Sequence, residues 1–137
     1  MPSPPGCFMP NRLRQWLIIT SFALLGWVLC AATMGIGMAA ASLDTALIFH
    51  TVATPVFFAT ISTIYFNRYA YTCPLMTAVS FLVIVVLMDV FVVAMLIQRS
   101  FEMFSSFLGT WLPFVLIFGS TYLTGVIVRS GAGRART

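Results

Sequence analysis

The chain contains very little charge for its length. Of its 137 residues 7% are charged, lysine is absent and the acidic residues number three, whereas 61% are hydrophobic and the mean hydropathy is +1.04. A soluble domain of this size needs a charged surface to remain dispersed in water. The composition therefore excludes an ordinary soluble domain and predicts an integral membrane protein.

Residue types that carry catalysis or bind metals are also scarce. The chain has one histidine, and its three cysteines, Cys7, Cys30 and Cys73, form no CxxC or Cys/His cluster, so we expect reduced, incidental thiols. There is no HExxH sequence and no Ser/His/Asp arrangement with a Gly-rich turn. One histidine provides two haem ligands only across a dimer or together with a methionine. We predict no catalytic residue, no metal site, no cofactor and no enzymatic activity.

Four long apolar runs occupy most of the chain, at about residues 16–40, 43–66, 74–97 and 107–128. A helix of about 20 residues crosses a hydrocarbon core of roughly 30 Å. The sequence thus predicts an all-α integral membrane protein, with four antiparallel transmembrane helices in a compact bundle formed by residues 15–129. Residues 1–14 are predicted to be a disordered, Pro-rich tail, and residues 130–137 a second short tail.

The arginines predict the orientation of this bundle. Six of the seven precede the first run, separate the second from the third, or follow the fourth: Arg12, Arg14, Arg68, Arg129, Arg134 and Arg136. This excess places both termini in the cytoplasm and the protein in the inner (plasma) membrane, with Arg99 on the opposite side. The positive charge is divided among short tails and a turn, so we expect contact with anionic lipid and no nucleic-acid binding.

The first run has a second interpretation as a signal peptide. Arg12 and Arg14 precede an apolar stretch that ends in GIGMAAAS, with a small-residue cleavage site near residues 39–41. This stretch exceeds the roughly 7 to 15 apolar residues typical of signal peptides, and we therefore expect a retained helix. Cleavage would leave three spans.

Small residues, prolines and aromatics predict finer features. Three small-xxx-small pairs in the first run, Ala31/Gly35, Gly35/Ala39 and Gly37/Ala41, predict close helix contacts. Pro55 and Pro113 are expected to kink the second and fourth helices, and a gating hinge is the alternative. Aromatics near the helix ends are expected to form an interfacial belt: Trp16, Tyr65, Tyr69 and Tyr71 on the inner side, and those of 101–111 on the outer. The alternative for 98–111 is a short amphipathic turn that serves as a docking surface.

Asp89 is the one acidic residue placed well inside an apolar run. An Asp near the centre of a membrane helix costs about 2.5 to 3.5 kcal/mol, so it normally faces a partner and marks a functional site. Counted along the helices, His50 lies ~10 Å and Asp89 ~12 Å below the outer edge, so they share a level. Thr33, Thr51 and Thr54 approach the same layer. We therefore expect His50 and Asp89 to contact each other, directly or through water.

Three interpretations of this layer remain open: a hydrogen bond that locks the second and third helices, a pair that handles protons or cations, and no contact at all. They lead to two functions. A non-catalytic accessory or assembly protein would act through its helix faces. A small oligomeric transporter of protons, cations or a solute would use the His50/Asp89 layer. The expected partners are the lipid bilayer and either a second copy of the chain or another membrane protein.

Several segments resemble a known group of proteins. They are RSFEMFSSFLGTWLPFVLIFGSTYLTG at 99–125, HTVATPVFFATISTIYF at 50–66, Arg68, and LMDVFVVAMLI at 87–97. Over about residues 45–125 the chain resembles small, uncharacterised bacterial four-span membrane proteins that have no assigned activity. The resemblance implies the four-span topology and nothing about mechanism. Small multidrug transporters also have four short spans, but their motif centres on a Glu in the first span, which here contains no acid.

Overall fold

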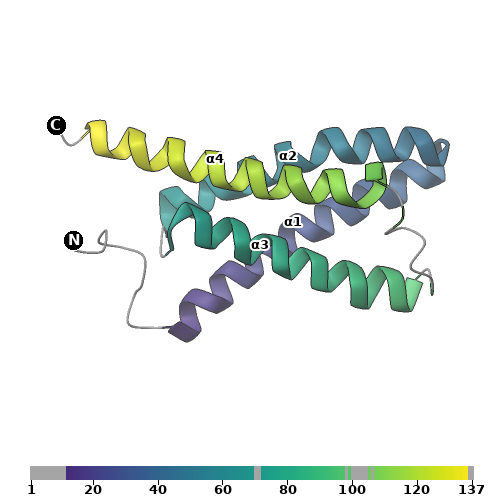
Figure 1. Cartoon of the computed structure of the whole chain (residues 1–137), viewed down its shortest axis with the longest axis horizontal. Coiled ribbons are helices and arrows are strands. Elements are labelled where there is room, and N and C mark those ends of the chain that lie inside the picture. The colour runs from purple at the N-terminus through teal and green to yellow at the C-terminus, as the bar shows by residue number, and fades with distance from the viewer. Residues whose placement is uncertain (1–11, 70–71, 98, 100–104, 106, 136–137) are drawn as a thin grey trace.

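The computed structural model describes residues 12–69, 72–97, 99, 105 and 107–135. These residues form the helices α1 (Arg12–Ala40), α2 (Leu43–Arg68), α3 (Pro74–Met88) and α4 (Leu112–Ala135). Two π-helices extend them: η1 (Asp89–Ile97) continues α3, and η3 (Phe107–Trp111) leads into α4 (Figure 1). The predicted all-helical fold with four long helices is confirmed. Most of the predicted N-terminal tail lies outside the described residues.

Local sequence signals account for the helix starts. Ser42 has extended backbone angles, and its hydroxyl accepts a hydrogen bond from the Thr45 main-chain N–H at 3.4 Å, which caps α2. Asp44 lies in the first turn of α2, where a negative charge favours the helix dipole. α3 begins with Pro74, whose missing N–H costs nothing at a first helical position.

Four helices in the described part of the chain are long and apolar enough to cross a membrane: Arg12–Ala40, Leu43–Arg68, Pro74–Leu96 and Leu112–Gly131. Many large apolar side chains on these helices lie on the outer surface of the bundle and are more than half exposed. Examples are Leu17 (59%), Phe49 (65%), Val115 (65%) and Ile127 (68%). Such surfaces suit lipid and not water. The chain has the character of a multi-pass membrane protein.

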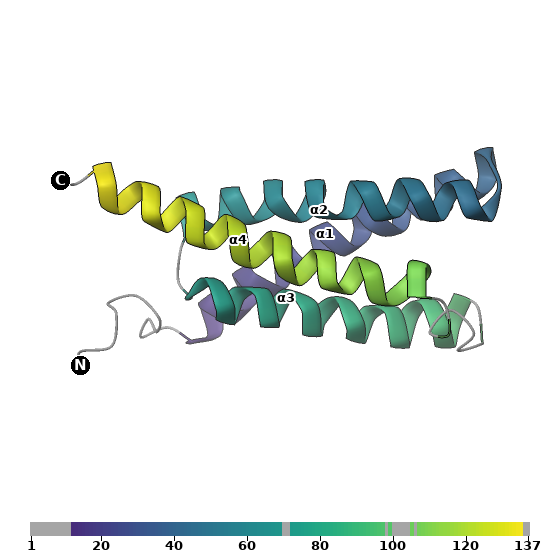
Figure 2. The same cartoon turned by 45° about the horizontal axis from the view of Figure 1, so that its top comes forward.

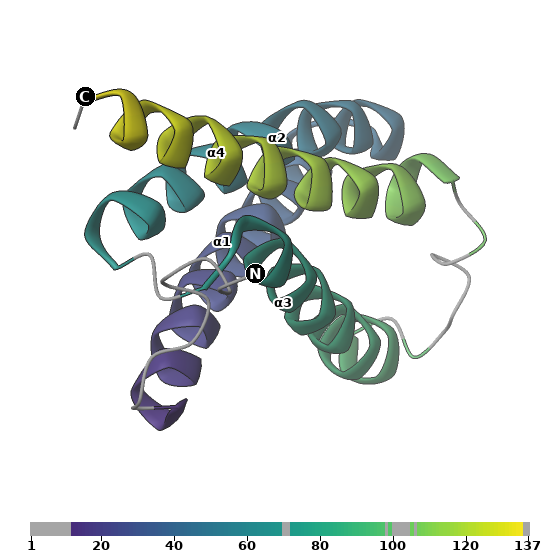
Figure 3. The ribbon, with the colours of Figure 1, turned by 60° about the vertical axis from the view of Figure 1, so that its left-hand side comes forward.

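The four helices form a ring in the order α1, α2, α4, α3. The main contacts join α1 with α2, α2 with α4, α4 with α3, and α3 with α1. Consecutive helices run in opposite directions, as predicted, but the extensive α2–α4 contact joins parallel helices, and α1 and α3 also run the same way (Figures 1 and 2). Within this ring α2 and α3 occupy diagonal positions, and α3 diverges from α2 towards the C-terminal end of α3 (Figure 3).

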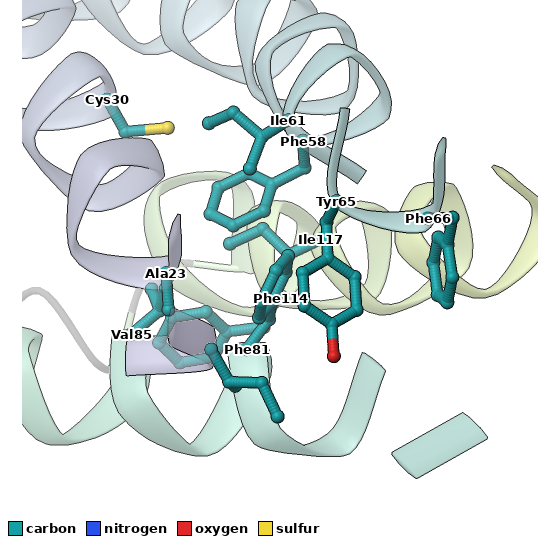
Figure 4. Packing of buried hydrophobic residues seen from close by; sticks show 11 residues of the cluster. Ala23, Cys30, Phe58, Ile61, Tyr65, Phe66, Phe81, Val85, Phe114 and Ile117 are labelled. Atoms are coloured by element: carbon teal, nitrogen blue, oxygen red, sulfur yellow. The ribbon is translucent and has the colours of Figure 1, made fainter. Parts of the chain in front are cut away.

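An aromatic cluster fills the centre of the ring (Figure 4). The ring of Phe81 lies edge-on to Phe58 and Tyr65, with centroids 6.1 and 6.2 Å apart, and Phe22 lies edge-on to Tyr65 at 5.7 Å. Tyr65 is 0% exposed, so its assignment to the aromatic belt was wrong. Trp16 is 46% exposed, and Tyr71 lies outside the described residues.

Glycines allow close helix contacts at positions different from most of those predicted. A Cβ atom on Gly37 would lie 2.9 Å from the Cβ of Ala46, so α1 and α2 do approach closely there. A Cβ atom on Gly35 would have nothing within 4 Å, so Gly35, the residue shared by the two predicted pairs with Ala31 and Ala39, is not at a close helix contact. The tightest sites are Gly26, against Phe58, and Gly125, against Phe66 and Pro74.

The two prolines occupy different structural positions. α2 continues through Pro55 as one helix. Pro113 is the second residue of α4, directly after η3, so the winding changes from π to α immediately before it. Because η3 and α4 are continuous, Pro113 lies inside a longer helical segment. Of the predicted outer aromatic turn, residues 98, 100–104 and 106 lie outside the described residues.

Candidate functional site

The carboxylate of Asp89 binds the indole of Trp27. The Trp27 Nε1–H of α1 donates a hydrogen bond to Asp89 Oδ1 at 2.8 Å in a partly buried position. The indole nitrogen is a donor only, and an ionised carboxylate only accepts, so the two groups are chemically matched. The intramembrane acid is therefore engaged by a neutral donor from a neighbouring helix.

Asp89 also stands where the helix changes its winding. Its main-chain N–H lies within hydrogen-bonding range of the carbonyls of Val85 and Val86, and η1 begins at this residue. The wider turns of a π-helix, where they occur inside α-helices, are frequently at functional sites. The Trp27 bond thus fixes α1 to the junction between α3 and η1.

The direction of the helices explains why these two residues meet. α1 and α3 are parallel neighbours, and Trp27 and Asp89 lie at equal distances along the chain from the first residues of their helices, Arg12 and Pro74. Sequence reasoning did not identify Trp27. The signal that could have found it is the indole itself, because a buried Trp N–H needs an acceptor and few are available in an apolar bundle.

A thiol and a hydroxyl connect α1 with α2 beside this bond. Cys30 Sγ lies 3.7 Å from Thr54 Oγ1, and the Thr54 hydroxyl donates to the main-chain carbonyl of His50 at 2.6 Å. Thr54 is fully buried, Cys30 is 7% exposed, and Cys30 is within electrostatic range of Asp89. Thr54 therefore belongs to the polar layer, as predicted, and Cys30 joins it.

His50 and Asp89 do not form the expected direct pair. The Nδ1 atom of His50 is buried and has no hydrogen-bond partner in the described part of the chain, and the imidazole interacts with the main chain of Cys30. No hydrogen bond or ion pair joins the imidazole to the Asp89 carboxylate among the described residues. The reason is the ring order: α2 and α3 are diagonal, so equal depth does not bring their side chains together.

The remaining predicted threonines bind their own helices. The Thr33 hydroxyl donates to the Leu29 carbonyl and the Thr51 hydroxyl to the Leu47 carbonyl, each at 2.8 Å. Such bonds to the preceding turn are common for threonine in helices. Thr33 and Thr51 are therefore satisfied locally.

A second polar cluster lies at the opposite end of the bundle, where sequence reasoning placed none. Tyr65 Oη lies 2.9 Å from Thr72 Oγ1, which lies 2.6 Å from Thr77 Oγ1, and the Thr77 hydroxyl donates to the Cys73 carbonyl at 3.0 Å. The side chains of Tyr65, Thr72 and Thr77 are all buried. This cluster fixes the α2–α3 connection to the aromatic core.

Cys73, in this connection, is disulfide-bonded, whereas Cys30 is free. The expectation of reduced thiols throughout was therefore wrong for Cys73. The spacing of cysteines along a chain does not reveal which of them approach one another in the fold.

Chemically, the layer of Trp27, Cys30, His50, Thr54 and Asp89 joins three helices through polar groups. No group of three or more His, Cys, Asp or Glu side chains suited to a metal ion occurs among the described residues. Protein-family models, curated proteins and solved structures were compared with the chain, and none of them matches.

Proposed function

We propose that the protein is a non-catalytic, multi-pass membrane protein that acts as an accessory or assembly subunit through its outer helix faces. The observation that carries this proposal is the hydrogen bond from Trp27 to Asp89. The intramembrane acid, the residue with the strongest claim to a chemical role, is engaged in joining two helices. The satisfied hydroxyls of Thr33 and Thr51 support the same conclusion.

Affinity purification in mild detergent tests this function. A tagged chain is expected to retain a specific membrane protein, or a second untagged copy, after solubilisation and washing. Leu25→Asn, on an exposed face, should weaken that retention without unfolding the chain, whereas Trp27→Phe, which removes the donor to Asp89, should weaken the fold itself. A purely monomeric preparation after crosslinking in intact membranes would contradict the proposal.

We further propose that both termini face the cytoplasm of an inner-membrane protein. The charge asymmetry supports this orientation, because the arginines of the α1, α2 and α4 ends lie at one end of the bundle and Arg99 at the other. The disulfide-bonded Cys73 lies at the same end of the bundle as those arginines. Cytoplasmic thiols are kept reduced, so this disulfide argues against the proposed orientation, which rests on the arginines alone.

Cysteine labelling in intact cells tests the orientation. A membrane-impermeant maleimide added outside spheroplasts should label Ser42→Cys, in the α1–α2 connection, and leave Asn67→Cys, at the opposite end of α2, unlabelled until the cells are opened. Labelling of Asn67→Cys from outside would reverse the proposed orientation.

A second function, a small oligomeric proton or cation transporter, is favoured by one observation: the buried Nδ1 of His50 has no partner in the described residues. An unpaired imidazole nitrogen beside Cys30 and near the level of Asp89 is available to exchange a proton. Proton flux into proteoliposomes decides between the two functions. Transport predicts flux that His50→Gln abolishes, whereas the accessory function predicts flux equal to that of empty vesicles.

A further inference from the structure

The disulfide at Cys73 has one available partner in the sequence. The chain contains three cysteines, Cys7, Cys30 and Cys73. Cys30 is a free thiol, buried against Thr54 of α2, whereas Cys73 is disulfide-bonded. Elimination therefore leaves Cys7, which precedes the described residues, as the second half of the bond.

Hydrogen bonds of its neighbours hold Cys73 in a fixed position. Its carbonyl accepts from the main-chain N–H of Thr77 at 2.9 Å and from the Thr77 hydroxyl at 3.0 Å. The preceding residue, Thr72, is buried, and its hydroxyl lies 2.9 Å from Tyr65 Oη. The side chain of Cys73 itself is only partly buried, which leaves it accessible to small reagents at this end of the bundle.

Cys73 is also the N-cap of α3, and this position favours a thiolate. Its backbone is extended, with φ −65° and ψ 154°, and Pro74 follows as the first helical residue. The positive end of the helix dipole stabilises a thiolate there, which is the form that attacks a disulfide and the form that leaves when a disulfide is reduced. The Cys73 sulfur is therefore suited to thiol–disulfide exchange.

The parallel arrangement of α1 and α3 brings Cys7 within reach of Cys73. These helices are neighbours, and both begin at the same end of the bundle (Figure 2). An extended chain advances about 3.3–3.6 Å per residue, so the segment from Cys7 to Arg12 spans up to about 17 Å. The axes of packed helices lie about 8–10 Å apart, which is well inside that length.

We propose that Cys7 and Cys73 form a redox-controlled clamp that fastens the N-terminal end of α1 to that of α3. The α1–α3 contact is the least extensive of the four in the ring, and its hydrogen bond between Trp27 and Asp89 lies farther along both helices. The disulfide closes a covalent loop through α1 and α2, which restricts the separated state and favours docking of α1 on α3. Reduction opens the clamp.

The clamp closes by two exchanges with a small disulfide, glutathione disulfide. The Cys73 thiolate attacks it, forms a mixed disulfide and releases one glutathione thiolate; the Cys7 thiolate then attacks the Cys73 sulfur, and the second glutathione thiolate leaves. The two protein thiols lose two electrons in total, and their two protons pass to the two glutathione thiolates. Excess reduced glutathione reverses both steps.

Peptide mapping tests the pairing. The purified chain, equilibrated with glutathione disulfide, alkylated and digested, is expected to yield one crosslinked peptide pair that contains Cys7 and Cys73 and separates on reduction. Cys30 is the internal control, because this buried thiol should be alkylated only after unfolding. Recovery of Cys73 as an alkylated thiol, as a stable glutathione adduct, or bonded to Cys30 or to a second copy overturns the proposal.

Unfolding in mixed detergent micelles tests the clamp and its redox control. Millimolar reduced glutathione is expected to open the disulfide and to lower the folding equilibrium constant at least about 10-fold. Cys7→Ser should match the reduced wild type with and without glutathione, whereas Cys30→Ala, the matched control, should keep the wild-type response. A constant unchanged by reduction overturns the clamp, and a disulfide that survives millimolar reduced glutathione overturns its redox control.

Discussion

Trp27 and Asp89, 62 positions apart in the chain, are joined by a hydrogen bond of 2.8 Å that connects α1 to the first residue of η1. The bond converts the most unfavourable side chain of the membrane-spanning region into a helix–helix contact. The acceptor is the Asp89 carboxylate, and hydrogen bonds to a charged group are stronger than those between neutral groups. Loss of the Trp27 N–H donor should therefore destabilise the helix bundle as a whole.

Replacing the donor alone is expected to destabilise the fold. Trp27→Phe keeps an aromatic ring but leaves the Asp89 carboxylate unpaired, and it should lower the free energy of unfolding by about 1–3 kcal/mol. Adding Asp89→Leu should restore part of that loss, because the unpaired acceptor is then removed as well. Unfolding in mixed detergent micelles measures both effects. Trp16→Phe, at an exposed position, should change stability by less than about 0.5 kcal/mol.

The contributions of His50 and Asp89 to stability are expected to be independent of each other. Since no direct contact joins the two side chains, the stability losses of His50→Ala and Asp89→Asn should add within about 0.5 kcal/mol in the double variant. A larger coupling free energy would show that the groups communicate through an intervening molecule. The same cycle between Trp27 and Asp89 is the positive control.

Two glycines offer a matched test of helix packing. Gly125→Ala places a Cβ atom 2.7 Å from both Phe66 and Pro74, and it should cost about 1–3 kcal/mol through overpacking. Gly35→Ala meets nothing within 4 Å and should stabilise α1 by up to about 1 kcal/mol through helix propensity. Equal effects of the two substitutions on unfolding would refute the parallel contact of α2 with α4.

The hydroxyl cluster of Tyr65, Thr72 and Thr77 is expected to stabilise the fold through its hydrogen bonds as well as through its packing. Tyr65→Phe retains the ring and removes the hydroxyl, and it should lower stability by about 1 kcal/mol because Thr72 loses a partner. Thr72→Val should add a further loss in the double variant, because it also removes the hydrogen bond of 2.6 Å between Thr72 and Thr77. At the half-exposed Tyr122 the same change to Phe is expected to be neutral, and thermal unfolding in detergent compares the variants.

Hydropathy was sufficient to predict the four helices, because length and apolar content alone determine which segments span a bilayer. It was insufficient for the neighbour of Asp89. Depth along a helix is a single coordinate. It predicted a contact between His50 and Asp89 but contained no information about which helices are neighbours. The ring order places Trp27 beside Asp89 and His50 diagonally opposite. That order depends on close approaches at Gly26 and Gly125, whose partners no local pattern reveals.

The same limit explains the error at Tyr65 and the change of winding next to Pro113, which was not predicted. Tyrosine near a helix end is typical of the membrane interface, but Tyr65 is covered by Phe22 and Phe81, which come from two other helices. Pro113 was interpreted as an interior kink because the apolar run extends on both sides of it. The change from π- to α-winding directly before it leaves no signal in hydropathy.

The diagonal placement of α2 and α3 has a consequence for how the chain assembles. α1 with α2, and α3 with α4, are two helical hairpins, and the segment between Arg68 and Pro74 is the main-chain link from one to the other. The most extensive contacts between the halves are the two parallel ones, α1 with α3 and α2 with α4. Each hairpin can therefore insert into the bilayer as a unit and dock afterwards, so two separately synthesised halves, cut within this link, contain every surface needed to recombine.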